Sequence, residues 1–248
     1  MSSSIISYTF VQIATILQGH IVELYKGELV INRLLLDSRQ ITFPETALFF
    51  AIVGEHYNAH KFLTEVYEKG VRNFVVSQAI DPHLLPNANV VLVTDTVAAL
   101  QLLASYHRQQ FNIPVIGITG SNGKTVVKEW LFQLLHKQYY VVRSPQSYNS
   151  QVGVPLSVWQ MSSQHQLAIF EAGISQPTEM ERLQTIIQPT IGIFTNIGTA
   201  HSKGFETQKL KVFEKLQLFK NVKCLIYRAD YTLITDCIAQ LKQQNKMA

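Results

Sequence analysis

The sequence predicts an α/β protein: a small N-terminal α/β domain, then a mainly parallel central sheet that contains a phosphate-binding loop and is covered by helices. Along both halves, apolar β-branched segments alternate with segments of helical apolar spacing. The strongest single unit is a strand, a glycine-containing loop and a helix over residues 114–136. Residues 111–114 (Phe-Asn-Ile-Pro) separate the halves, because proline resists continuation of the preceding helix. We therefore expect domains at 1–112 and 113–248.

The N-terminal half begins with a predicted helix over residues 9–18. Phe10, Ile13 and Leu17 recur there at helical spacing, and Gly19 is a plausible C-terminal stop. Further strands are expected at 29–36, 48–53, 73–76 and 90–93, and further helices at 61–69 and 96–109. This alternation predicts the first α/β domain.

The second half repeats the alternation more regularly. Strands are expected at 114–118, 139–143, 167–170, 191–195 and 224–227, and helices at 125–136, after Pro155, at 179–187 and at 209–219. Such βαβ units predict a mainly parallel sheet with helices on both faces. Ligands of these sheets bind at the carboxyl ends of the strands, so candidate site residues are sought there.

Composition narrows the class of protein. The charged fraction of 15% and net charge of +4 are spread along the chain without a basic block, so no nucleic-acid partner is expected and an anionic small molecule fits equally well. Two cysteines are too few for a disulfide framework, which favours a reducing compartment. The N-terminus lacks a basic n-region, and no apolar run approaches the roughly 20 residues of a membrane span. We therefore expect a cytoplasmic protein without a membrane partner.

The loop at residues 120–125 (Gly-Ser-Asn-Gly-Lys-Thr) has the chemistry of a phosphate cradle. Small residues let backbone N–H groups approach phosphate oxygens at a helix N-terminus, Lys124 can neutralise β/γ-phosphate charge, and the Thr125 hydroxyl can bind Mg²⁺. The general pattern places a glycine at position 118, where this chain has Ile118, so the loop is a variant. A glycine turn with a surface lysine is the alternative, but the strand before and the helix after favour the phosphate loop.

Three further residues lie where a ligand is expected. Glu171 follows a predicted strand directly, which suits a Mg²⁺ ligand beside a phosphate loop, although an ordinary carboxylate at a strand end is equally possible. His201 lies in the loop after the strand at 191–195, where a lone histidine is usually just solvated. Lys215 lies within a predicted helix, and helical geometry alone does not single it out.

Several separated stretches share the pattern of one known family. They are residues 117–125, Tyr148-Asn149 followed by Gly153-Val154-Pro155, Glu171-Ala172-Gly173, and residues 196–201 (Asn-Ile-Gly-Thr-Ala-His). Together they resemble the Mur ligases of peptidoglycan synthesis, and the resemblance spans nearly the whole chain. With Glu179, the Glu171 stretch is most similar to the type that adds D-alanyl-D-alanine to UDP-N-acetylmuramoyl-tripeptide. Relatives that add a diamino acid typically carry Ser-Ser-His after the glutamate.

The resemblance implies an ATP site with two Mg²⁺ ions. The ATP-binding residues it implies are Gly120, Ser121, Asn122, Gly123, Lys124, Thr125, Val126 and Asn149. Thr125 and Glu171 would bind the first Mg²⁺, and His201 the second. Lys215 corresponds to a lysine that CO₂ carbamylates in the family and that bridges toward the metals, so Lys124, His201 and Lys215 would be catalytic. The second asparagine of the Asn149 motif is Ser150 here, which weakens any specific role for position 150.

The same resemblance implies that the first domain holds the uridine diphosphate end of the substrate. The residues it implies are Asp37, Ser38, Arg39 and His60. An arginine can pair with phosphate oxygens in bidentate fashion. Two family motifs differ here, since Pro-Gly-Asp is replaced by Pro44-Glu45-Thr46 and Asp-Gly-His by Asn58-Ala59-His60.

The implied activity is amide ligation. ATP phosphorylates the terminal carboxylate of the UDP-muramoyl-tripeptide, and the amine of D-alanyl-D-alanine displaces the phosphate. Family members continue beyond the position of Ala248, so we expect a fragment with a truncated central domain. Two alternatives stay open: a non-catalytic nucleotide-binding fragment, and another P-loop ATPase, kinase or Mur ligase with a different substrate.

Overall fold

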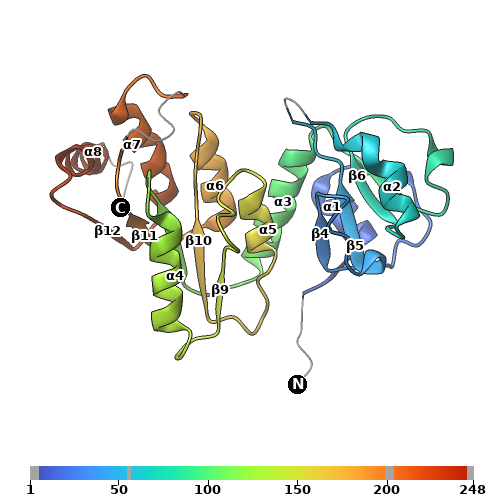
Figure 1. Ribbon diagram of the computed structural model, residues 1–248, viewed down its shortest axis with the longest axis horizontal. Coiled ribbons are helices and arrows are strands. Elements are labelled where there is room, and N and C mark those ends of the chain that lie inside the picture. The colour runs from blue at the N-terminus through green and yellow to red at the C-terminus, as the bar shows by residue number, and fades with distance from the viewer. Residues whose placement is uncertain (1–5, 55–56, 199–203, 245–248) are drawn as a thin grey trace. The chain divides into compact units, whose positions relative to one another are not determined.

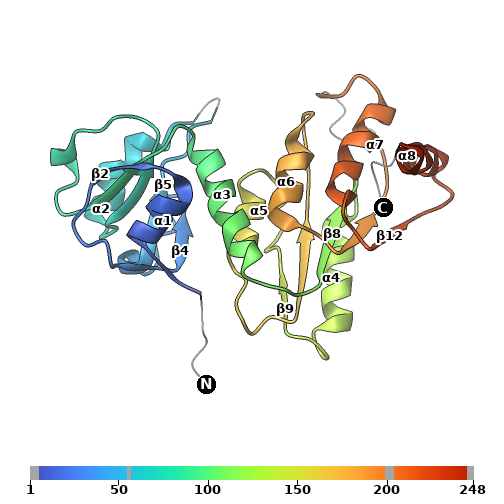
Figure 2. The same ribbon diagram turned by 180° about the vertical axis from the view of Figure 1, so that it is seen from behind.

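The computed structural model describes residues 6–54, 57–198 and 204–244, in two compact units, Met1–Tyr106 and His107–Ala248. Each unit is a sheet with helices packed against it (Figures 1 and 2). The mixed α/β fold class predicted from the sequence is confirmed. The division falls inside α3 (Thr96–Gln109), whereas we expect the domain boundary just after that helix.

The described part of the first unit contains a five-stranded sheet in the order β2-β7-β6-β5-β4. The strands are β2 (His20–Glu23), β4 (Arg33–Leu35), β5 (Ala47–Phe50), β6 (Asn73–Val76) and β7 (Asn89–Leu92). Neighbours from β4 to β7 run parallel, and β2 pairs antiparallel with β7. The helical segments are α1 (Phe10–Leu17), η1 (Pro44–Thr46), η2 (Ala59–Phe62), α2 (Leu63–Glu68), η3 (Pro82–Leu84) and α3. The unit is therefore a mixed sheet with short crossovers.

The predicted strand at 29–36 is two strands in the structure. β3 (Val30–Ile31) pairs antiparallel with β1 (Tyr8–Thr9), and β4 pairs with β5. Between them the Asn32 N–H donates to the carbonyl of Thr46, 3.2 Å away. One apolar run thus changes partner sheets at a single residue, which its composition does not reveal.

The second unit carries a parallel sheet in the order β12-β11-β8-β10-β9 among its described residues. The strands are β8 (Val115–Thr119), β9 (Val141–Arg143), β10 (Leu167–Glu171), β11 (Ile191–Phe194) and β12 (Cys224–Tyr227). The helical segments are α4 (Lys124–Leu135), α5 (Gly153–Val158), α6 (Glu179–Ile187), α7 (Gln208–Leu216), η5 (Gln217–Phe219) and α8 (Thr232–Gln243). The predicted parallel sheet is confirmed.

Alternating side chains of β8 point to opposite faces of this sheet. Ile116 and Ile118 belong to a buried cluster with Val127 and Leu131 of α4. Gly117 faces the other way, because a Cβ built there would lie 3.5 Å from the Leu218 side chain. Figures 1 and 2 show α4 on one face of the sheet and α6 on the other. Helices thus cover both faces, as predicted.

This topology places three strand ends side by side. The first strand of the unit, β8, lies between β10 and β11, and all three run in the same direction. The strand order reverses at β8, and ligands of open parallel sheets bind at such a switch point, beyond the carboxyl ends of the strands. The loops after β8, β10 and β11 therefore frame the candidate site.

Candidate active site

The loop between β8 and α4 depends on two glycines in the left-handed region. Gly120 has φ of 145° and Gly123 has φ of 80°. A Cβ at Gly120 would lie 2.0 Å from Oγ1 of Thr195, and nothing lies within 4 Å of a Cβ at Gly123. Gly120 is therefore required by both conformation and close approach, and Gly123 by conformation alone.

The loop after β11 braces the phosphate loop from one side. The Ser121 N–H donates to the Asn196 carbonyl at 2.9 Å, and the Asn122 N–H donates to Oδ1 of Asn196 at 3.0 Å. Oγ1 of Thr195 donates to the Asn122 carbonyl at 2.6 Å, and Oγ of Ser121 accepts the Gly198 N–H at 3.0 Å. These bonds fix the loop backbone before any ligand arrives.

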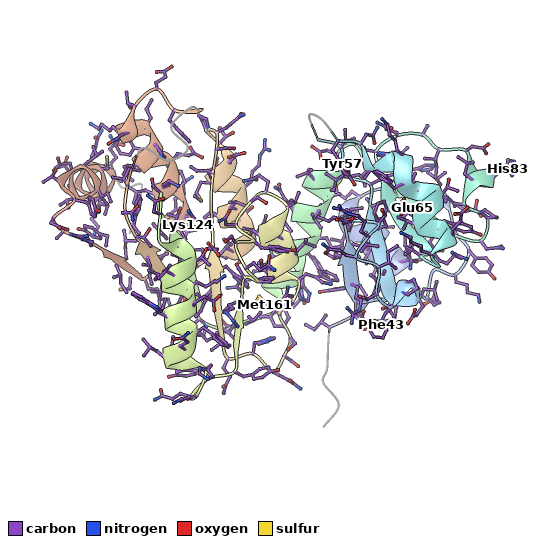
Figure 3. The ribbon with its side chains drawn as sticks, in the orientation of Figure 1. Phe43, Tyr57, Glu65, His83, Lys124 and Met161 are labelled. Carbon is purple, nitrogen blue, oxygen red and sulfur yellow. The ribbon has the colours of Figure 1, made fainter. Side chains whose placement is uncertain are left out.

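Lys124 is the first residue of α4 (Figure 3), and its side chain reaches back to the loop. Its Nζ donates to the carbonyls of Gly120 and Ser121 at 3.0 and 3.3 Å. Burial lowers the pKa of Lys124, the nearby Glu171 carboxylate opposes that shift, and Lys211 adds to it. The first intrahelical bond runs from the Val127 N–H to the Gly123 carbonyl at 2.9 Å. The N–H groups of the first turn, Val126 included, have no partner within the helix and suit an anion.

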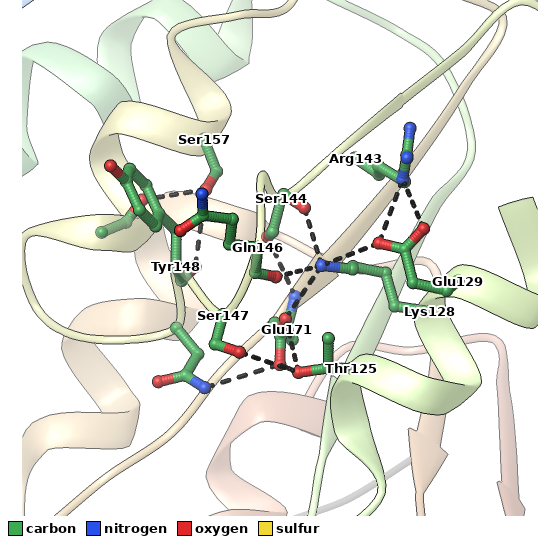
Figure 4. A network of polar contacts seen from close by, with 12 residues as sticks. Thr125, Lys128, Glu129, Arg143, Ser144, Gln146, Ser147, Tyr148, Ser157 and Glu171 are labelled. Atoms are coloured by element: carbon green, nitrogen blue, oxygen red, sulfur yellow. Dashed lines mark hydrogen bonds and ion pairs between the residues drawn. The ribbon is translucent and has the colours of Figure 1, made fainter.

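Thr125 and Glu171, which the sequence places far apart, are in contact. Oγ1 of Thr125 donates to the two carboxylate oxygens of Glu171 at 3.0 and 3.2 Å and lies 3.2 Å from Oγ of Ser147 (Figure 4). Nδ2 of Asn149 lies 3.5 Å from Oε2 of Glu171. Glu171 ends β10 and is fully buried, so its carboxylate is held on the site side of the sheet.

These oxygen donors fit a divalent cation of the magnesium type. Mg²⁺ prefers hard oxygen ligands and is usually held by one or two protein groups together with substrate phosphates. Thr125 and Glu171 supply a hydroxyl and a carboxylate within hydrogen-bond distance of each other, next to the phosphate loop. Among the described residues no group of three histidine, cysteine or acidic side chains could hold a metal alone. Ligand oxygens would therefore have to complete the coordination.

Lys215 also reaches the phosphate loop. It lies on α7, is buried, and its Nζ donates to the Gly120 carbonyl at 3.3 Å, the same oxygen that Lys124 contacts. Burial and then the charges of Lys124 and Lys211 lower the pKa of Lys215 to about 7, against a weaker opposing effect of Glu214. Lys215 therefore loses its proton far more readily than an ordinary lysine.

Sequence reasoning missed one cation of this cluster, Lys211. It precedes Lys215 by one helical turn, is buried, and its Nζ donates to the Gly198 carbonyl at 3.0 Å. Burial lowers its pKa. A lysine on the buried side of an amphipathic helix is the signal that could have revealed it.

A cavity of about 290 Å³ opens beside these groups. It is lined by Gly120, Ser121, Lys124, Asn149, Ser150, Gln151, Val152, Gly173, Ile174, Ser175, Glu179 and Lys215. The lining combines backbone groups, hydroxyls and two lysines. Such a cavity can receive an anionic group that the loop and the lysines hold from one side.

His201 lies outside the described residues, so its position relative to Glu171 stays a prediction. The remaining predicted ATP-binding and metal-binding residues, Gly120 to Val126, Asn149, Glu171 and Lys215, come together at the carboxyl edge of the sheet.

Each of the residues predicted to bind substrate in the first unit already has a protein partner. Arg39 forms an ion pair with Asp37, with 2.7 Å between Nη2 and Oδ2, and this contact lowers the pKa of Asp37 to about 2. Ser38 is buried, and its carbonyl accepts a bond from Nζ of Lys69 at 3.0 Å. A diphosphate would therefore compete with Asp37 for the exposed Arg39 guanidinium.

His60 has both ring nitrogens occupied. Nε2 accepts the backbone N–H groups of Ser77 and Gln78 at 3.0 and 3.3 Å, so Nδ1 carries the proton and donates to Oδ1 of Asn58 at 2.9 Å. Burial lowers its pKa, which favours this neutral form. The ring holds the turn after β6, and any effect on a ligand would act through that turn.

The fold and the site together define a nucleotide-binding α/β protein with a phosphate loop at the carboxyl edge of a parallel sheet. Residues 118–247 match the model of the Mur ligase middle domain. The chain belongs to the Mur ligase family. Within the described residues, no helix has the length and apolar character needed to cross a membrane.

Individual relatives point in the same direction. The chain is 31% identical over 232 residues to a UDP-N-acetylmuramoyl-tripeptide–D-alanyl-D-alanine ligase of Bacillus subtilis, covering 92% of this chain and 50% of the relative. A crystal structure of MurF from Acinetobacter baumannii superposes with a TM-score of 0.82 at 26% identity, covering 95% of this chain and 52% of that one. The crystal structure of MurF from Thermotoga maritima in complex with ADP superposes with a TM-score of 0.72 at 25% identity. The superposition covers 86% of this chain and 48% of that one. The chain therefore spans about half the length of these relatives.

Proposed function

We propose that this chain provides the nucleotide-sugar and ATP-binding parts of an ATP-dependent ligase that adds D-alanyl-D-alanine to UDP-N-acetylmuramoyl-tripeptide. The observation that carries the proposal is the meeting of Lys124, Thr125, Glu171 and Lys215 around one loop at the carboxyl edge of the sheet. The relatives named above supply the substrate class.

Each side chain has a role that its position supports. The loop amides and Lys124 would hold the β- and γ-phosphates of ATP, and Thr125 and Glu171 would hold a first Mg²⁺. His201 and a carbamylated Lys215 would hold a second. Mg²⁺ held there would supply positive charge to offset that of the phosphoryl group as it passes to the tripeptide carboxylate. Because attack by the dipeptide amine on the acyl phosphate needs no protein nucleophile, the protein contributes mainly by orienting the reactants and by electrostatics.

The Lys124→Ala variant tests the ATP site. Calorimetry with ADP and Mg²⁺ should show binding to the parent chain and at least about a tenfold loss in the variant, since removing a charge-assisted contact costs about 1.5 kcal/mol or more. The fold should survive, because the Nζ contacts of Lys124 are to loop carbonyls, which can bond to water. Equal ADP affinity in the two chains would remove Lys124 from the site.

A second measurement separates the ligase from a binding module or from another ATPase. Phosphate release from ATP that requires both UDP-N-acetylmuramoyl-tripeptide and D-alanyl-D-alanine supports the ligase. Nucleotide binding without that turnover supports a non-catalytic module, and hydrolysis indifferent to the UDP-sugar supports an ATPase of another class. A ¹³C carbamate resonance from labelled bicarbonate, absent in Lys215→Met, would support carbamylation.

A further inference from the structure

One buried cation beside the phosphate loop has no role in the function proposed above. Lys128 lies one helical turn after Lys124 on α4 and is 0% exposed. Lysines are almost never fully buried unless they are paired, because the ammonium loses its hydration. The contacts that compensate this loss show what Lys128 holds in place.

The Lys128 ammonium has three hydrogens and meets three acceptors from two other segments (Figure 4). It donates to the carbonyl of Ser144 at 2.8 Å, to the carbonyl of Gln146, and to Oε1 of Glu171 at 3.1 Å. Oε1 of Glu129 lies 3.3 Å away as a second ion pair. Lys128 thus joins α4 to the turn after β9 and to the end of β10.

The turn after β9 adopts an uncommon backbone conformation. Gln146 is an exposed residue with φ of 46°, a left-handed conformation that costs most side chains about 1 kcal/mol or more. In this conformation its carbonyl points inward to Lys128. The next residue, Ser147, contacts the Thr125 hydroxyl at 3.2 Å. The charge on Lys128 therefore stabilises a turn that itself reaches the candidate metal ligand Thr125.

The Lys128 ammonium also gives the two carboxylate oxygens of Glu171 different hydrogen-bond partners. Oε1 accepts from Lys128 and from Thr125, whereas Oε2 accepts from Thr125 and from Nδ2 of Asn149. Lys128 pairs with Oε1, whereas the partners of Oε2 are a hydroxyl and an amide, so Oε2 is the oxygen better placed to bind a cation. A carboxylate held in this way has one orientation available for a cation.

We infer that Lys128 is a positioning residue for the magnesium–nucleotide site: its ammonium fixes the Glu171 carboxylate and the turn at 144–147 around Thr125. The inference rests on the proposed function, because it concerns the same site. Residues that orient metal ligands typically change metal affinity by about 10- to 100-fold when removed. Lys128 itself touches neither nucleotide nor metal in this assignment.

The test measures the Mg²⁺ dependence of ADP binding to the intact chain. ADP affinity is determined by calorimetry in EDTA and over a series of Mg²⁺ concentrations, which gives the Mg²⁺ midpoint. Lys128→Met should raise this midpoint by about 10- to 100-fold and leave ADP affinity in EDTA within about twofold of the parent. Glu129→Gln is the matched control, because it removes the neighbouring ion pairs of Lys128 and Arg143 without touching Glu171. Its midpoint should not move.

Lys128→Gln keeps the test decisive if the methionine variant does not fold. A glutamine amide can still donate to the two carbonyls of the turn but carries no charge for Glu171, so the fold should recover while the midpoint stays raised. A folded variant with an unchanged or lowered midpoint would overturn the inference and leave the ATP site intact. Absence of ADP binding by the parent chain would instead overturn the proposed function, and this inference with it.

Discussion

Substituting Gly120 by alanine tests whether the phosphate loop has its shape because of the neighbouring loop. The new Cβ would lie 2.0 Å from Oγ1 of Thr195 and 3.0 Å from the backbone N and O of Asn196. Thr195 cannot move away freely, because its hydroxyl donates to the carbonyls of Asn122 and Thr119 at 2.6 and 3.3 Å. The substitution therefore forces either the loop or its brace to shift.

The expected loss of unfolding free energy in Gly120→Ala has two parts. Alanine at φ of 145° carries the strain of a sparsely populated conformation, about 1 to 3 kcal/mol, and overpacking adds about 1 to 3 kcal/mol. Gly123→Ala is the matched control, because its φ of 80° is strained but nothing lies within 4 Å of the new Cβ. Its cost should be about 1 to 2 kcal/mol. Gly120→Ala should therefore lose about two to three times as much unfolding free energy as Gly123→Ala.

Urea unfolding followed by tryptophan fluorescence measures this difference. The two tryptophans of the chain, Trp130 and Trp159, both belong to the second unit, so the signal reports the unit that contains the loop. With a slope of about 1 to 3 kcal/mol per molar urea, Gly120→Ala should lower the midpoint by about 1 M or more. In a Thr195→Ala background, Gly120→Ala should lose less unfolding free energy, since Oγ1 of Thr195, the atom nearest to the new Cβ, is absent. Equal midpoints for the two glycine variants would refute the close-approach argument.

Two further predictions concern buried polar side chains. Burial lowers the pKa of His107 to about 4, so between about pH 4 and 6.5 the unfolded chain binds more protons and unfolding free energy falls as pH falls, by up to about 3 kcal/mol. His107→Phe, which also loses the contact to the Met161 carbonyl, should flatten this pH profile in urea titrations; an unchanged profile would contradict the assignment. Asn89→Ala should cost the first unit about 2 to 4 kcal/mol, because Asn89 bonds to Asn73 and to the backbone of Lys26. Faster amide exchange in β6 and β7 would support it, and unchanged exchange would contradict it.

The parallel sheet and its phosphate loop could be predicted because the signals are local. β8 is a continuous apolar run, α4 follows with apolar residues at helical spacing, and the glycines between them leave few alternatives. Glu171 could be placed at the site since it ends a buried strand. In the first unit, β1 and β3 were missed or merged because strands of two residues carry little periodicity, and β2 was missed because none of its residues is fully buried, unlike those of β6.

The role of Lys128 could not be assigned from the sequence, because its partners are remote. Lys128 lies at helical spacing with Leu131 and Leu135 of α4, which are partly buried against the core, and this placement of a charge on an apolar stripe is the one local signal of its burial. Its acceptors come from the turn after β9 and from Glu171, 43 residues away. The inward turn of the Gln146 carbonyl likewise depends on a tertiary contact. The helix and strand propensities of single residues predict neither the acceptors of Lys128 nor the conformation of Gln146.

Three lysines around the phosphate loop explain why this loop favours an anion. Lys124, Lys211 and Lys215 are held by the carbonyls of Gly120 and Gly198, and each has its pKa lowered by burial. The folded chain therefore disfavours their charges, and a polyphosphate that pairs with them restores those charges. Lys215 is the most affected, with a pKa of about 7, and a neutral amine is the form that attacks CO₂. The proposed carbamate would convert Lys215 into an oxygen ligand and remove its repulsion with Lys124 and Lys211 in one step.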